Sequence, residues 1–240
     1  MTLPTIAVST FEVTLPSNQK KLKLRSMLTK EEKVLLIAKE SRDLNDVMVA
    51  VTDVIQACIQ EPKDTKVTDW PIFDVEYAFV RLRSMSVSPT IDWGLVDQTN
   101  QKEHKFKIDL NDVKVVGLEG REAPFVINVG NGIKFTLDYP KVALHGDKKF
   151  LDLRGERSFN AMLAKSLVSI SQNEITTKAK DIKPDELEAW VDTLPIQAYN
   201  DAREFFRDLP HIEWTTEYTD GNGEKVPVRL STLNDFFMFV

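Results

Sequence analysis

The chain opens with apolar and polar positions that alternate as they do in short strands. Residues 6–15 and 22–27 each fit one strand, and Pro16, Ser17 and Asn18 between them are typical turn residues. This pattern predicts a β-hairpin at the start of the fold.

The spacing of apolar residues then changes to that of helices. Thr29 and Glu32 form a capping-box pattern, in which the threonine hydroxyl and the glutamate each accept a backbone N–H at the helix start. A second apolar stripe begins after Asp43, and a third, densely apolar helix follows Pro71. Residues 30–86 are therefore predicted to form three packed helices.

Alternation returns between residues 90 and 139. The runs that fit strands are separated by glycines, and Gly130-Asn131-Gly132 favours a hairpin between the last two. We predict a β-rich stretch whose strands include residues 91–93, 106–110, 113–116, 125–127 and 133–137.

Helical spacing returns after Pro140. It predicts a helix over 157–172 and two shorter helices that begin at Pro184 and Pro195. A hairpin over 212–230 then turns at a Gly-Asn-Gly sequence and closes the fold.

These elements predict an α+β fold. Its parts are a hairpin plus three-helix domain over 1–88, a β-rich segment over 89–140, and a helical C-terminal part with a terminal hairpin over 141–240.

Composition and charge narrow the classes of function. Hydrophobic residues make up 42% of the chain and charged residues 28%, which is ordinary for a globular protein. The net charge of −6 argues against binding to nucleic acid or to an anionic membrane, although Lys20, Lys21, Lys23 and Arg25 leave room for a local basic patch. A single cysteine, no visible signal peptide and no apolar run near the length of about 20 residues that spans a bilayer predict a soluble product of a reducing cytoplasm.

Metal, nucleophile and cofactor chemistry find no support in the residue spacing. His104, His145 and His211 are scattered, and His104 is predicted to be a solvated turn residue. Cys58 falls on the apolar stripe of the second helix, which predicts a buried thiol and not a nucleophile. We expect no metal, cofactor or catalytic residue.

Phosphate loops and carboxylate dyads are equally unsupported. The glycines lack the strand–loop–helix context of a nucleotide site. Asp74 and Glu76 are two residues apart and so do not share a helical face, although a dyad built from distant residues is not excluded by sequence.

Two features are candidates for partner binding. One is the terminal run that contains Phe236, Phe237 and Phe239, and its alternative role is to dock onto the protein's own core. The other is the third helix, with Tyr77, Arg81 and Arg83 as the contact residues. Its alternative is core packing in which both arginines pair with acids.

Five runs along the chain carry a family resemblance: residues 11–17, 22–25, 29–41, 73–77 and 82–87. They resemble the T4-like bacteriophage baseplate protein family, which includes a baseplate hub subunit and a baseplate hub assembly catalyst. The resemblance covers most of the chain, is most specific before residue 90, and favours the assembly catalyst. Some members carry a cysteine pair after the third helix, but residues 93–99 contain none here, so a metal ribbon is absent from that segment.

The resemblance implies a non-enzymatic protein that binds other baseplate hub and tail proteins while the central hub is built. Its location would then be the host cytoplasm during assembly. One alternative is a structural hub subunit that stays in the virion tail, and a lower one is an unrelated cytosolic enzyme with a dispersed carboxylate site. Self-association, as a homo-oligomer, is left open by the sequence.

Overall fold

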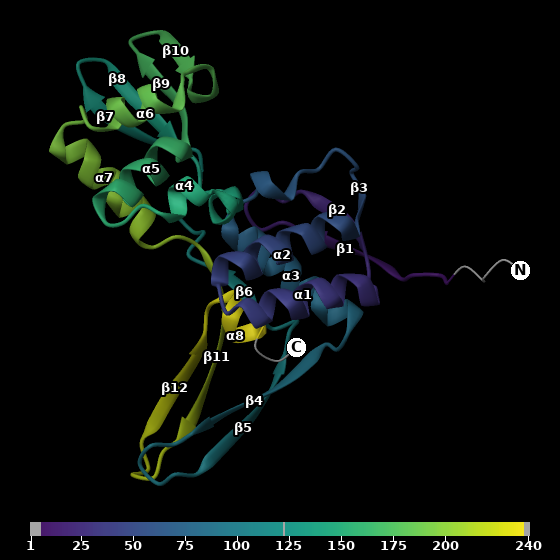
Figure 1. Ribbon diagram of the computed structural model, residues 1–240. Helices are drawn as coiled ribbons and strands as arrows, with labels where there is room; N and C mark the ends of the chain where they lie inside the picture. Colours follow the sequence, from purple (N-terminus) through teal and green to yellow (C-terminus); the bar gives the residue numbers. More distant parts are fainter. Residues whose placement is uncertain (1–5, 122, 238–240) are drawn as a thin grey trace, which may run out of the picture. The chain divides into compact units, whose positions relative to one another are not determined.

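The protein's structure is a computed structural model, which describes residues 6–121 and 123–237. The chain forms two compact units (Figure 1). Unit 1 comprises the chain up to Val67, Phe73–Val116 and the chain from His211, and unit 2 comprises Thr68–Ile72 and Gly117–Pro210. Helices and several small sheets give an α+β fold, as predicted.

Unit 1 begins with the predicted hairpin. Strands β1 (Thr10–Thr14) and β2 (Lys21–Arg25) pair antiparallel, and their alternation buries Val13, Leu22 and Leu24 on one face. A third strand, β3 (Ile59–Glu61), pairs with β2 and was not predicted, because Pro62 indicated only the end of a helix.

The three predicted helices follow this hairpin. They are α1 (Thr29–Ser41), α2 (Leu44–Cys58) and α3 (Ile72–Ser86). The capping prediction at the start of α1 is wrong by one residue: the Glu31 carboxylate, not that of Glu32, accepts the backbone N–H of Leu28 at 2.8 Å. Asp43 caps α2 by accepting the N–H of Asn45.

A partly buried ion pair ties β2 to both of the first two helices. Arg25 Nη2 donates to Glu31 Oε1 at 2.8 Å and to the carbonyl oxygen of Ala57 at 3.0 Å. Burial disfavours the Glu31 carboxylate, but the hydrogen bonds from Arg25 and Leu28 outweigh it and lower the pKa of Glu31 to about 2.

The rest of unit 1 is built from two long hairpins (Figure 1). The first follows α3, and the second pairs at its base with a short strand from the middle of the chain. The elements are β4 (Thr90–Val96), β5 (Glu103–Asp109), β6 (Lys114–Val116), β11 (His211–Thr219), β12 (Lys225–Leu230) and α8 (Leu233–Phe237).

Unit 2 contains a four-stranded antiparallel sheet in the order β10-β9-β8-β7. Its strands are β7 (Phe125–Gly130), β8 (Ile133–Leu137), β9 (Leu167–Gln172) and β10 (Ile175–Lys178). Its helices are α4 (Lys148–Leu151), α5 (Glu156–Ser166), α6 (Pro184–Val191) and α7 (Ile196–Arg207). Short 3-10 turns are η1 (Val67–Asp69), η2 (Val142–Gly146) and η3 (Ala179–Asp181).

The predicted helix over 157–172 is only half correct. Helix α5 ends at Ser166, and the remaining residues form β9. Over so short a run, the apolar residues Leu167, Val168 and Ile170 fit both helical spacing and strand alternation. This segment is a strand because it pairs with β8 and β10.

The β-rich stretch contributes to both units, with β4–β6 in unit 1 and β7–β8 in unit 2. The division of the chain into 1–88, 89–140 and 141–240 stays a prediction.

Candidate interaction site

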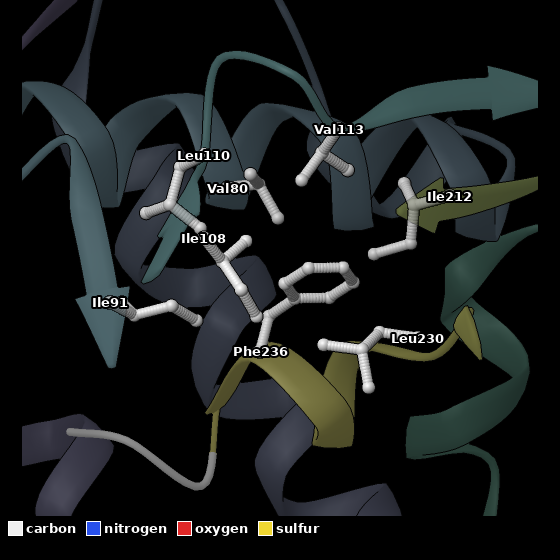
Figure 2. Close-up of a cluster of buried hydrophobic side chains, with 8 residues drawn as sticks. All are labelled: Val80, Ile91, Ile108, Leu110, Val113, Ile212, Leu230 and Phe236. Carbon is white, nitrogen blue, oxygen red and sulfur yellow. The ribbon is translucent and has the colours of Figure 1, made fainter. Parts of the chain in front are cut away.

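A hydrophobic cluster joins α3, both long hairpins and α8 (Figure 2). Its members come from chain segments more than a hundred residues apart. They are Val80, Ile91, Ile108, Leu110, Val113, Ile212, Leu230 and Phe236, and each is at most 5% exposed. The cluster therefore holds the bases of the two hairpins on the helical part of unit 1.

Phe236 lies within this cluster. Its side chain is 0% exposed, and Figure 2 shows the ring pointing from α8 in among the aliphatic side chains. In this conformation the ring is a core side chain and is not available at the surface. The side chain of Phe237 and the whole of Phe239 lie outside the described residues, so their predicted role stays a prediction.

Tyr77 and Arg81 lie at the edge of the same cluster. The guanidinium carbon of Arg81 lies 4.7 Å from the centroid of the Tyr77 ring. Arg81 donates to the backbone carbonyls of Leu110 and Val113, both at 3.0 Å, and so fixes the turn after β5. Arg81 also donates to Asn111 Oδ1 at 3.3 Å, so within the described part of the chain its partners are carbonyl oxygens and not the acid that the core-packing alternative expected.

Buried charge distinguishes the rest of α3. Arg83 is 6% exposed, and burial lowers the pKa of its guanidinium. Asp74 is 0% exposed and accepts the backbone N–H of Ser17 at 3.0 Å, together with the Ser17 hydroxyl. Glu76 is 8% exposed and accepts the backbone N–H of Leu233 at 3.2 Å. These carboxyls attach the first hairpin turn and α8 to α3.

The tips of the two long hairpins are joined by Asp97. This side chain is fully buried and accepts the Thr99 backbone N–H and hydroxyl and, at 2.9 Å, the backbone N–H of Gly221. Burial opposes the charge on Asp97, but these hydrogen bonds together outweigh it, and its pKa is lowered. The two hairpins thus form one arm, held at its base by the cluster and at its tip by Asp97.

His104 lies beside this junction and is not the solvated turn residue that was predicted. It lies on β5, its side chain is 17% exposed, and its Nε2 is 4.0 Å from Asp97 Oδ2. Its ring centroid is 4.5 Å from that of Tyr218 on the other hairpin. The alternation of β5 turns His104 toward the neighbouring hairpin, which local sequence could not reveal.

The tip junction leaves no space for a side chain at Gly221. A Cβ there would lie 2.6 Å from Thr99 Oγ1 and 2.8 Å from the Asn100 Cβ. We expect Gly221→Ala to separate the tips and to remove the hydrogen bond to Asp97, at a cost of about 1–3 kcal/mol. Hydrogen exchange at residues 96–103 and 219–225 should speed up.

The matched control is Gly94→Ala on the same arm, where an added Cβ meets nothing closer than 3.4 Å. Equal exchange at both tips in the two variants would show that the junction does not hold the arm together.

The predicted placement of Cys58 is confirmed. The thiol is buried on α2, and burial raises its pKa to about 11. Among the described residues no group of three or more His, Cys, Asp or Glu side chains is arranged to hold a metal ion. Within the same residues no helix has the length and apolar character to cross a bilayer.

Exposed apolar side chains concentrate on α1 and the start of α2, a feature that the sequence pattern did not reveal. Of the apolar run 34–38, only Leu35 and Ala38 are buried. Val34 is 43% exposed, Ile37 68%, and Leu44 at the start of α2 61%. We call Val34, Leu36, Ile37 and Leu44 the α1 apolar surface. Large contiguous apolar patches are a common feature of protein contact sites, which makes this surface a candidate.

Comparison with known proteins now assigns the chain to a family. The family model described as T4 bacteriophage base plate protein matches residues 8–238. The chain belongs to this family. No curated protein and no solved structure matches it. Phage baseplate families of this kind are generally structural.

Proposed function

We propose that this baseplate protein is a non-enzymatic assembly factor that binds other hub and tail proteins while the central hub is built. Membership of the baseplate family supports a role in the phage tail. The observation that carries protein binding is the α1 apolar surface, where Ile37 is 68% exposed and Leu44 61%. Leaving such side chains in water forgoes about 25 cal/mol for each Å² that a partner would cover.

The arm formed by β4–β5 and β11–β12 supports the same proposal. Its two hairpins are fixed at the base by the cluster around Phe236 and at the tip by Asp97. Such an element can meet a partner without first being ordered, so little conformational entropy is lost on binding.

The first test is co-purification of tagged protein from infected cells. We expect tail or baseplate proteins to be recovered with it. Recovery of none of them would reject the proposed function. Ile37→Gln with Leu44→Gln should lower recovery at least about tenfold with little change in thermal stability, because both side chains are exposed. The control Lys33→Gln, at an exposed position of α1, should leave recovery unchanged.

A permanent hub subunit is the second candidate, and family membership supports it equally. Antibody detection in purified virions separates the two. Stoichiometric signal in mature tails would replace the assembly factor by a subunit that stays in the tail.

The lower alternative was an enzyme with a dispersed carboxylate site. The buried carboxyls of Asp74 and Glu76 accept backbone N–H groups from Ser17 and Leu233, which gives both a structural role. This supports the non-enzymatic proposal.

A further inference from the structure

Four lysines line a groove on unit 2. Two neighbouring hollows, of about 420 and 380 Å³, share the lining residues Lys141, Lys165, Leu167 and Lys180. Lys178 on β10 lines the first hollow. We call this feature the lysine groove.

Positive charge in the lysine groove exceeds its negative charge. All four lysines are exposed, and only Lys165 has an ion pair within the described part of the chain, with Asp147 Oδ2 at 2.8 Å. The acids in the lining are Asp138 in the first hollow and Glu188 in the second. This excess lies on a chain whose net charge is −6. A concave surface lined by one sign of charge concentrates its field on a ligand of the opposite sign.

The apolar part of the lining indicates a peptide and not a small free anion. Leu167 lies in both hollows, Val168 lies in the first, and Ile182 and Leu187 lie in the second. An extended segment with alternating acidic and apolar side chains would satisfy the lysines and cover these side chains together. A phosphate ion would contact the lysines but would leave the apolar side chains of the lining exposed to water.

We propose that the lysine groove binds an acidic segment of a partner protein, whose carboxylates contact Lys141, Lys178 and Lys180. This names the chemistry of one partner contact and rests on the protein-binding function proposed above.

The test is the binding of a fluorescent peptide, Glu-Leu-Glu-Leu-Glu, to the full chain, measured by anisotropy at several salt concentrations. We expect binding that weakens as salt rises. Lys141→Glu with Lys180→Glu should weaken it about tenfold or more. The control Lys134→Glu with Lys149→Glu makes the same change of charge at exposed positions outside the lining, and should leave binding within about twofold of the unmodified protein.

Three results would overturn the proposal. An equal loss of peptide affinity in both double variants would show that binding depends on the net charge of the protein and not on the groove. Equal binding of Gln-Leu-Gln-Leu-Gln would show that carboxylates are not recognised. Displacement of the peptide by inorganic phosphate at concentrations as low as those of the peptide would make the groove a small-anion site.

The proposed function is tested separately. If Lys141→Glu with Lys180→Glu abolishes peptide binding and tail proteins still co-purify, the groove binds acidic peptide but is not their contact. That result overturns the partner assignment and leaves the proposed function standing. If the unmodified chain recovers no tail protein, the proposed function fails, and the peptide measurement still decides what the groove binds.

Discussion

Phe236→Ala should destabilise the protein by about 3–5 kcal/mol, the range for removing a buried phenylalanine ring from a packed core. The ring is 0% exposed and contacts side chains from α3 and from both long hairpins. Its loss leaves a cavity where these three elements meet. The free energy of unfolding from urea denaturation, followed by Trp fluorescence, measures the effect.

The control is Val87→Ala, which removes apolar atoms from a side chain that is 62% exposed, and it should change stability by less than about 0.5 kcal/mol. Unchanged stability in Phe236→Ala, together with loss of tail-protein recovery, would show that this residue is a partner anchor and not part of the core.

Stability should fall as pH rises from about 4 to above 7. Burial raises the pKa of Asp74 to about 6, against the lowering by its bonds from Ser17. Burial raises that of Glu76 to about 7, with nearby Asp235 adding to the effect. The ordinary values, 3.8 and 4.5, apply to the unfolded chain. The folded state therefore binds both protons more tightly, and each carboxyl removes on the order of 3 kcal/mol of stability by pH 8.

Glu31 acts in the opposite direction at lower pH. Its pKa of about 2 in the folded protein lies below the ordinary 4.5, so its contribution is complete above pH 4.5 and is lost as pH falls toward 2. Together these shifts predict maximum stability near pH 4. Denaturation series between pH 3 and 8 measure the profile.

Glu76→Gln isolates one carboxyl. The amide oxygen can still accept the Leu233 N–H, so we expect little change at pH 5 and a gain on the order of 3 kcal/mol at pH 8. Glu40→Gln, at an exposed position of α1, should leave the profile unchanged. A flat profile in the unmodified protein between pH 5 and 8 would show that burial does not control these carboxyls.

Local sequence predicted most of the elements because their signals are local. The hairpins formed by β1–β2 and β11–β12 have turn residues between alternating runs, and α2 has a full apolar stripe bounded by Asp43 and Pro62. Strand β9 was missed because its apolar residues do not distinguish a strand from a helix until β8 and β10 pair with it.

The candidate site was less predictable because its contacts join distant segments. Asp97 is 124 residues from Gly221, and no spacing rule connects them. Only the local contact of Asp97 could be predicted, because an aspartate that accepts the N–H of the residue two positions later, here Thr99, is a common turn pattern. The exposure of Ile37 depends on how α1 packs. The sequence of an apolar run does not show whether its side chains pack in the core or contact another protein.

The pairing of β6 with β11 has a consequence for the order in which the protein is made. Lys114–Val116 must wait for His211–Glu213, and residues 117–210 leave the ribosome between them. Unit 2 can therefore fold on the nascent chain while unit 1 still lacks its second hairpin and Phe236. A chain interrupted before residue 211 would therefore contain the residues of the lysine groove but not β11 and β12, and its arm would be incomplete.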